Sequence, residues 1–376
     1  MSERIARFLA EQTPETPCLV VDLDVIGAAY EGLRRYLPLA QIYYAVKANP
    51  AAEIVRMLNR KSASFDVASR GEIGLCLKNG VAPDQLSFGN TIKKERDIAY
   101  AYEAGVRLFA FDSARELEKL ARAAPGARVF CRILVTCDGA EWPLSRKFGC
   151  APEMAVELLQ QAGDAGLDPY GISFHVGSQQ TDLGQWDGAV GAAARMFSVL
   201  AETDINLRMV NIGGGFPAHY STDVPGVERY AQAVMVAITR HFGNDLPEII
   251  IEPGRSLVGD AGVIQSEVVL IAEKGGGDGR RWVYLDVGKF NGMAETMDES
   301  IRYRIETPGR KGTTRPVVIA GPTCDSADIM YERTEYRLPE DLAVGDKVEI
   351  LSTGAYTSSY ASVAFNGFEP IRTYCI

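Results

Sequence analysis

Short apolar runs alternate with amphipathic segments over residues 42 to 254. The apolar runs are rich in β-branched and aromatic residues, which is typical of buried strands. We predict strands at eight places: 42–48, 64–68, 86–90, 108–112, 128–134, 171–176, 208–214 and 248–254.

The segments between these runs have helical spacing. Within residues 113–124, Leu117 and Leu120 share one face while Glu116 and Lys119 share another, and residues 152–166 end on a glycine. A strand followed by a helix, eight times over, predicts an α/β fold, a (β/α)8 TIM-like barrel. A doubly wound sheet is the alternative, although it rarely has eight such units.

The pattern changes after about residue 260, where helical spacing fades. Strand-like runs at 262–273, 281–288, 315–321 and 347–363 are separated by turns such as 274–280. We therefore predict a C-terminal antiparallel β-sheet domain, and a strand at 18–26 that joins its sheet. The predicted division is a barrel over 27–258 and a β-sheet domain made of 1–26 and 259–376.

Composition narrows the class of protein. Apolar residues make up 47% and charged residues 23%, with a net charge of −10. Such a charge argues against nucleic acid and anionic membranes as partners. Seven cysteines without metal-ligand spacing indicate reduced thiols and a cytoplasmic protein. Residues 1–17 lack the apolar core of a signal peptide and predict a short helix, and no apolar run is long enough to span a membrane.

Candidate functional residues occur where each predicted barrel strand ends, which is where barrels of this kind carry their chemistry. These are Lys47, Asp66, Asn90, Asp112, Arg132, His175, the glycines 213–215 and Glu252. Any one of them could be an ordinary loop residue, since loops are solvated. Their occurrence at every strand indicates a site.

Their chemistry suggests a ligand. A lysine at the end of a buried strand needs a partner for its nitrogen, and a glycine run late in a barrel can bind phosphate through backbone N–H groups. Arg132 within a strand should face an anion. With a carboxylate at Glu252 and an imidazole at His175, these groups fit a phosphorylated ring aldehyde. Pyridoxal phosphate would form a Schiff base with Lys47.

Several motifs, in order, resemble the fold-type III pyridoxal-phosphate decarboxylases, and among them the ornithine decarboxylases. They are YYAVKANP, SFDVASRGEI, RKFG, FHVGSQ, GGGFP, EPGRSLV, GPTCDSAD and GAYTSSYASVAFNGF. The resemblance covers nearly the whole chain. It implies an alanine-racemase-like barrel with a β-sheet domain, and decarboxylation of L-ornithine to putrescine and CO2 in polyamine biosynthesis.

The resemblance also implies residue roles. Lys47 would hold the cofactor aldehyde, Glu252 the pyridine nitrogen, and His175 would stack on the ring. Asp66 would support Lys47, and Arg132 would support Glu252. The phosphate would be bound by Ser178, Gly213, Gly214, Gly215, Gly254, Arg255 and Tyr356. No metal site is implied.

A homodimer with shared active sites is a further implication. Cys324 would protonate the substrate carbon in the neighbouring subunit's site, and Asp325 and Asp298 would bind the distal ammonium of a diamino acid. Lys147 and Asp328 resemble an ion pair across the interface.

Substrate choice stays open at this point. Lys289 and Met297 stand where eukaryotic relatives have tyrosines, and one methylene between lysine and ornithine is worth only about 1–3 kcal/mol. A lysine or dual lysine/ornithine decarboxylase is therefore an alternative. A second alternative is an inactive paralogue that binds a protein partner. The presence of Lys47, Glu252, Cys324 and Asp325 argues against it. A third alternative is a phosphate-binding barrel that does not need Lys47.

Overall fold

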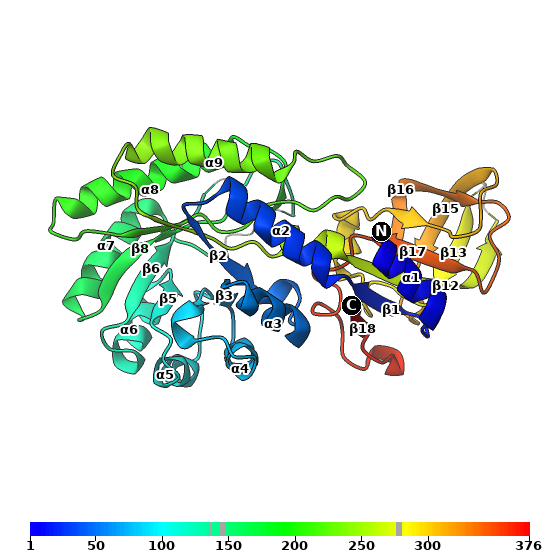
Figure 1. Ribbon diagram of the computed structural model, residues 1–376, viewed down its shortest axis with the longest axis horizontal. Coiled ribbons are helices and arrows are strands. Elements are labelled where there is room, and N and C mark those ends of the chain that lie inside the picture. The colour runs from blue at the N-terminus through cyan, green and yellow to red at the C-terminus, as the bar shows by residue number, and fades with distance from the viewer. Residues whose placement is uncertain (136, 143–146, 276–279) are drawn as a thin grey trace. The chain divides into compact units, whose positions relative to one another are not determined.

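The computed structural model describes residues 1–135, 137–142, 147–275 and 280–376 (Figure 1). The chain forms two compact units. The barrel unit comprises residues 27–217 and 224–254, and the sheet unit comprises residues 1–26, 218–223 and 255–376. The domain boundaries that we predicted from the sequence stay a proposal.

The barrel predicted from the sequence is confirmed. Eight parallel strands close on one another in the order β10-β11-β2-β3-β4-β5-β6-β8. Their bounds are β2 Ala40–Ala45, β3 Ser64–Val67, β4 Leu86–Phe88, β5 Leu108–Phe111, β6 Arg128–Arg132, β8 Asp168–Ser173, β10 Met209–Asn211 and β11 Glu248–Ile251. A separate pair, β7 Ala140–Trp142 and β9 Ser178–Gln180, is antiparallel.

Helices surround these strands. They are α2 Leu23–Tyr36, α3 Ala52–Arg60, α4 Arg70–Lys78, α5 Glu95–Glu103, α6 Ala114–Ala123, α7 Pro152–Asp164, α8 Gln185–Ala201 and α9 Val227–Phe242. The predicted helices at 113–124 and 152–166 correspond to α6 and α7, and α6 buries Leu117 and Leu120 as its spacing indicated. Helices α8 and α9 pack side by side (Figure 1).

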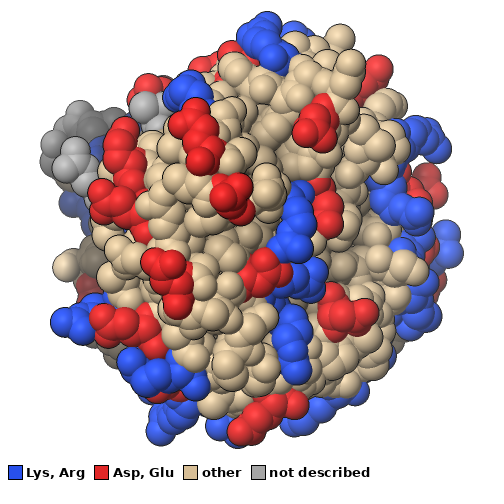
Figure 2. Space-filling model, turned by 90° about the vertical axis from the view of Figure 1, so that its left-hand side faces the viewer, with Lys and Arg blue, Asp and Glu red and all other residues tan. Residues whose placement is uncertain are grey.

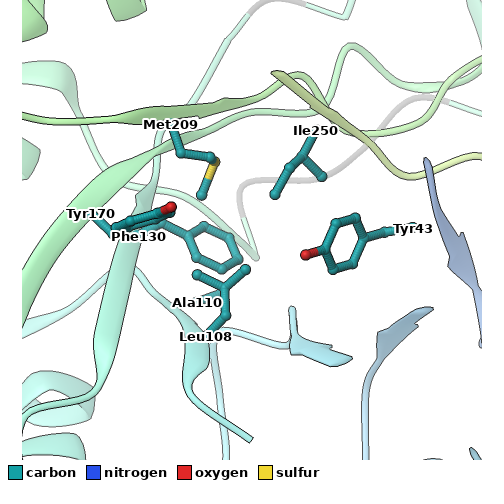
Figure 3. Packing of buried hydrophobic residues seen from close by; sticks show 7 residues of the cluster. All are labelled: Tyr43, Leu108, Ala110, Phe130, Tyr170, Met209 and Ile250. Atoms are coloured by element: carbon teal, nitrogen blue, oxygen red, sulfur yellow. The ribbon is translucent and has the colours of Figure 1, made fainter. Parts of the chain in front are cut away.

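The barrel interior is filled by side chains. A buried cluster contains Tyr43, Leu108, Ala110, Phe130, Tyr170, Met209 and Ile250 (Figure 3). These residues come from six different strands, so the cluster ties the barrel together across its axis by burial of apolar surface. The Tyr170 hydroxyl donates to the Glu248 carboxylate at 2.8 Å.

Charged side chains of both signs are interspersed on the face of the barrel unit seen in Figure 2. Arg128 and Arg208 both lie over the Tyr170 ring, with guanidinium carbons 4.9 and 4.5 Å from its centroid. Arg208 also pairs with Asp168. The prediction that this protein does not bind nucleic acid stays a prediction.

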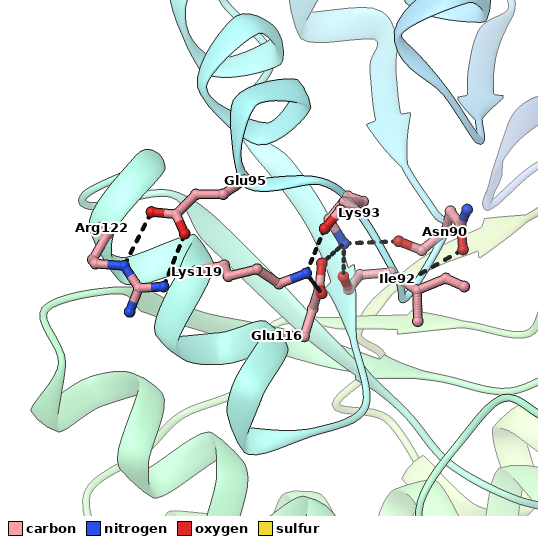
Figure 4. Close-up of polar contacts among 8 residues, drawn as sticks. Asn90, Ile92, Lys93, Glu95, Glu116, Lys119 and Arg122 are labelled. Atoms are coloured by element: carbon pink, nitrogen blue, oxygen red, sulfur yellow. Dashed lines mark hydrogen bonds and ion pairs between the residues drawn. The ribbon is translucent and has the colours of Figure 1, made fainter.

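A buried ion-pair network joins the ends of β4 and β5 to α6 (Figure 4). The Lys93 ammonium donates to the carbonyl oxygens of Asn90 and Ala110 at 2.7 and 2.6 Å, and lies 3.0 Å from the Glu116 carboxylate. Lys119 pairs with the other oxygen of Glu116. Burial lowers the pKa of Lys93 to about 8, although Glu116 opposes this. The network therefore replaces the water that the lysine loses on burial.

The sheet unit carries the remaining elements. They are α1 Glu3–Gln12, β1 Cys18–Val21, α10 Arg255–Val258, β12 Gly262–Glu273, β13 Arg281–Leu285, β14 Ile305–Glu306, β15 Thr314–Ala320, β16 Ile329–Pro339, β17 Lys347–Leu351 and β18 Arg372–Cys375. The path β14-β17-β12-β13-β15-β16 forms one sheet, and β1 joins it through β12 as predicted.

Three details of the sheet prediction are wrong. The sheet is mixed rather than wholly antiparallel, because β1–β18 and β13–β15 are parallel pairs. The strand expected over 18–26 ends at Val21, since Leu23 already begins α2, and the strand expected over 347–363 ends at Leu351. Of the predicted turn 274–280, residues 276–279 lie outside the described part. Within the described ranges, no helix combines the length and apolar character needed to cross a membrane.

Candidate functional site

Lys47 lies just beyond strand β2, in the 3-10 turn Val46–Ala48, rather than at the strand's last position. The turn is held by the Tyr44 hydroxyl, which donates to the Asn49 carbonyl at 2.8 Å. The Lys47 ammonium lies 3.1 Å from Oδ2 of Asp66, the third residue of β3. The lysine side chain is 49% exposed and that of Asp66 only 4%. The lysine is therefore both accessible and paired with a buried carboxylate.

Asn211 links Glu252 to the glycine run. Its side-chain amide donates to Oε1 of Glu252 at 2.5 Å, while its carbonyl oxygen accepts from the Gly213 N–H at 2.9 Å. The Glu252 N–H donates to the Gly213 carbonyl at 2.8 Å. Sequence reasoning missed Asn211, because an amide at the end of a strand is an ordinary feature there.

The electrostatics of Glu252 are unusual. Burial, helped by the negative charge of Asp66, raises its pKa to about 7 against the attraction of Lys47, Asn211 and Arg132. Without a cationic neighbour, the Glu252 carboxyl readily takes up a proton. A cationic group placed beside it would lower its pKa and keep it anionic. Its pKa therefore suits a partner such as a protonated ring nitrogen.

At Gly213, Gly214 and Gly215, neighbouring backbone atoms lie so close that any side chain would collide with them. A Cβ atom at Gly213 would lie 2.4 Å from the Phe174 carbonyl oxygen, one at Gly214 would lie 2.7 Å from that of Glu252, and one at Gly215 would lie 2.7 Å from that of Gly177. Gly213 and Gly215 also have φ angles of 68° and 100°. This close-packed backbone turn begins just after β10, at the strand ends, and is a candidate anion cradle.

His175 and Arg132 complete the barrel residues. Burial and the charges of Arg132 and Lys47 lower the pKa of His175 well below its ordinary value, so its imidazole is neutral. Nδ1 accepts the Gly177 N–H at 3.0 Å, and Ser178 follows as the first residue of β9. Arg132 is the last residue of β6. A neutral ring is the form suited to stacking on an aromatic ligand.

Arg255 and Tyr356 belong to the sheet unit. The Arg255 guanidinium is buried and makes two bonds to the Glu295 carboxylate, at 2.7 and 2.6 Å. It also donates to the Tyr220 hydroxyl at 2.7 Å and lies 4.9 Å from the centre of the Tyr356 ring. Sequence reasoning missed Glu295 and Tyr220, which carry no local signal. Gly254 ends the barrel unit.

The residues expected at the substrate lie in the sheet unit as well. Asp298 lines a cavity of about 440 Å³ together with Lys289 and Met297. Cys324 is exposed, and its N–H donates to Oδ1 of Asn366 at 2.8 Å. Asp325 lies two residues before Ala327, which lines the same cavity.

Asp328 has an internal role in a single chain. It is buried and accepts the N–H groups of Lys289 and Thr323, and the Thr323 hydroxyl, at 2.7, 3.0 and 2.6 Å. The Lys147 ammonium lies 4.9 Å from the centre of the Phe148 ring. An ion pair between Asp328 and Lys147 of a second subunit stays a prediction, and Arg146 of the RKFG motif lies outside the described residues.

A parallel barrel with an accessible lysine, a buried carboxyl and a glycine turn at its strand ends is the arrangement expected of a pyridoxal enzyme. Residues 23–259 match the family described as pyridoxal-dependent decarboxylase, pyridoxal binding domain. The chain belongs to the pyridoxal-dependent decarboxylases, as the sequence motifs predicted.

Known proteins resemble this chain over its whole length. It is 37% identical to the lysine/ornithine decarboxylase of Selenomonas ruminantium over 370 residues, which is 98% of this chain and 91% of that protein. The crystal structure of the Selenomonas ruminantium lysine decarboxylase (SrLDC) in complex with pyridoxal phosphate (PLP) and cadaverine matches this chain with a TM-score of 0.90 at 35% identity. The match covers 100% of this chain and 94% of that one. The lysine/ornithine decarboxylase of Vibrio vulnificus complexed with cadaverine has a TM-score of 0.89 at 31% identity, covering 100% and 99%.

The cofactor of this family, pyridoxal phosphate, fits the barrel residues. The buried oxygen Oδ1 of Asp66 has no hydrogen-bond partner in the described structure, which leaves it able to accept a hydrogen bond. The backbone N–H groups of the glycine turn are of the kind that bind phosphate, and the accessible amine of Lys47 is of the kind that condenses with an aldehyde. The family match and the solved relatives with bound PLP confirm the cofactor prediction, while the role of each single residue stays a proposal.

Proposed function

We propose that this protein decarboxylates L-ornithine to putrescine and CO2, with L-lysine, giving cadaverine, as a second substrate. The observation that supports this is the combination of a pyridoxal-binding barrel with an exposed acidic residue, Asp298, in the wall of a cavity of the sheet unit. The sequence alone favoured ornithine. The relatives are named lysine/ornithine decarboxylases, which supports including lysine.

The cofactor, when bound, supplies an aldehyde that condenses with amines and a ring that accepts the electron pair released as CO2 leaves. Lys47 would hold and later reclaim that aldehyde, with Asp66 keeping its ammonium in place at 3.1 Å. Glu252 would hold a proton at the ring nitrogen, and Arg132 would stabilise its carboxylate. His175 would pack on the ring. Ser178, Gly213 to Gly215, Gly254, Arg255 and Tyr356 would bind the phosphate.

The far end of the substrate is an ammonium group. Asp298 and Asp325 would bind it, which selects amino acids with a second amine at the end of an aliphatic chain. Cys324 would return a proton to the α-carbon once CO2 has left. In a homodimer, Cys324 and Asp325 would come from the neighbouring subunit.

The test is release of CO2 from ornithine, lysine, arginine and diaminopimelate by the holoenzyme, with amine products identified. We expect putrescine and cadaverine, and little turnover of the other two. Lys47→Ala should lose both turnover and the visible absorbance of the bound cofactor, whereas Lys78→Ala, at an exposed lysine, should keep both. Release of CO2 from arginine or diaminopimelate alone would disprove the substrate assignment, and a fully active Lys47→Ala would disprove the role of that lysine.

A further inference from the structure

The segment Ala294–Glu299 of the sheet unit is fixed at both ends by buried carboxylates. Near its start, Glu295 makes two hydrogen bonds with Arg255. At its end, Glu299 bonds to strand β16. The exposed residues between them, Met297 and Asp298, line the cavity of about 440 Å³.

The backbone of this segment is strained at the cavity. Asp298 has φ 53° and ψ 14°, and Glu299 has φ 57°. Residues other than glycine enter this left-handed region at a cost of about 1–2 kcal/mol, and they do so as single residues. Two in succession persist only when surrounding contacts enforce them, and such places cluster at functional sites.

Glu299 provides those contacts. Its carboxylate accepts the backbone N–H groups of Glu332, Arg333 and Thr334, at 2.9, 2.8 and 2.7 Å. These donors are available because the pairing of β16 with β15 is interrupted between Tyr331 and Tyr336. Burial opposes ionisation of Glu299, but the hydrogen bonds from Thr334, Glu332 and Arg333 lower its pKa to about 2. The carboxylate is therefore a permanent anchor at neutral pH.

We propose that Glu299 is a positioning residue, which holds Asp298 in its left-handed turn and so fixes the site for the distal ammonium of the diamino acid. The proposal rests on the proposed function of Asp298. Glu299 itself need not touch the substrate. Its bonds to β16 place the carboxylate of its neighbour at the cavity wall.

Glu299→Gln is the test, because both carboxylate oxygens accept N–H groups and an amide nitrogen would set a donor against a donor. We expect the KM for ornithine and lysine to rise about 10- to 100-fold, with kcat changed less. Inhibition by added putrescine should weaken by a similar factor. The affinity for pyridoxal phosphate, followed by absorbance, should stay within about twofold. Glu335→Gln, an exposed glutamate of the same strand, is the matched control.

A variant with a lowered melting temperature but unchanged KM and putrescine inhibition would show that Glu299 acts only in stability, and would overturn the proposal. If Glu299→Gln does not fold, Glu299→Asp, which keeps the charge but shortens the reach, should raise KM by a smaller factor. An unchanged KM in that folded variant would equally overturn it. If the unmodified holoenzyme releases CO2 from neither ornithine nor lysine, the proposed function fails instead. Putrescine affinity, measured as a thermal shift, then decides the role of Glu299.

Discussion

Glu252 and His175 show how the same buried surroundings act oppositely on an acid and a base. Burial raises the pKa of the glutamate to about 7 and lowers that of the histidine well below its ordinary value. Both groups are thereby driven toward their neutral forms in the protein without cofactor. For the histidine this favours stacking on a ring. For the glutamate it makes a cationic partner strongly favourable.

The two shifts predict opposite effects of pH on the stability of the cofactor-free protein. Glu252 binds a proton more tightly in the folded state, so its contribution is full below its ordinary pKa of 4.5 and is lost as the pH rises through about 7. His175 contributes stability above its ordinary pKa of 6.5, which is lost as the pH falls. Glu252→Gln removes the first effect and leaves the second.

We therefore expect the Glu252→Gln protein without cofactor to lose stability more steeply than the unmodified protein as the pH falls from about 7 to about 5. Urea unfolding at several pH values measures this. Glu53→Gln, on the surface of α3, serves as the control. Identical pH slopes for Glu252→Gln and the unmodified protein would contradict the prediction.

At the level of elements, the hydrogen bonds and ion pairs of Lys93 connect strand β5 and the segment after strand β4 to helix α6. The Lys93 ammonium has no exposed surface, and the Glu116 side chain is 3% exposed. Removing one partner from a buried ion pair leaves the other charge inadequately paired. In this network, two backbone carbonyls would also lose their donor (Figure 4).

Lys93→Met should therefore destabilise the protein by about 3 kcal/mol or more. Lys94→Met, at the exposed neighbouring residue, should change stability by no more than about 0.5 kcal/mol. Urea unfolding of the two variants side by side gives the comparison. Equal stability of both would mean that Glu116 is satisfied by Lys119 alone.

At the scale of the whole molecule, the proposed site residues come from two compact units of the chain. Lys47 and Glu252 belong to the barrel unit, while Cys324, Asp325 and Asp298 belong to the sheet unit. In the proposed homodimer, Cys324 and Asp325 of one subunit would meet Lys47 and Glu252 of the other. In such a shared site, a defect in one subunit's barrel residues can be compensated by the intact barrel residues of its partner.

Mixing two variants that are impaired at different residues of the proposed site should restore activity above that of either variant alone. Lys47→Ala and Cys324→Ala, combined in equal amounts and allowed to exchange subunits, should form heterodimers in which one of the two sites is intact. About a quarter of the unmodified activity is then expected from random pairing. Sedimentation should show a dimer. Restoration of no activity, in a sample that sedimentation and labelled subunits show to exchange, would place each site within one subunit.

Much of the fold and part of the site could be predicted from the sequence. The alternation of apolar runs with helical segments predicted all eight barrel strands, since period and length are local properties. Lys47 and Glu252 were proposed as site residues because polar residues after buried strands stand out, and the glycines because a glycine run after a strand indicates a tight backbone turn. The mixed sheet and the early ends of two strands were not found, because pairing partners far along the chain decide direction and length.

The sequence by itself determined the barrel and the pyridoxal cofactor, because periodicity and motif order are local properties of the chain. Only the tertiary structure decided that Asn211 holds Glu252, that Glu295 holds Arg255 and that Glu299 fixes Asp298. These contacts join residues that are distant in sequence or that bond to another strand. The shifted pKa values of Glu252 and His175 follow from burial, which exists only once the chain has folded.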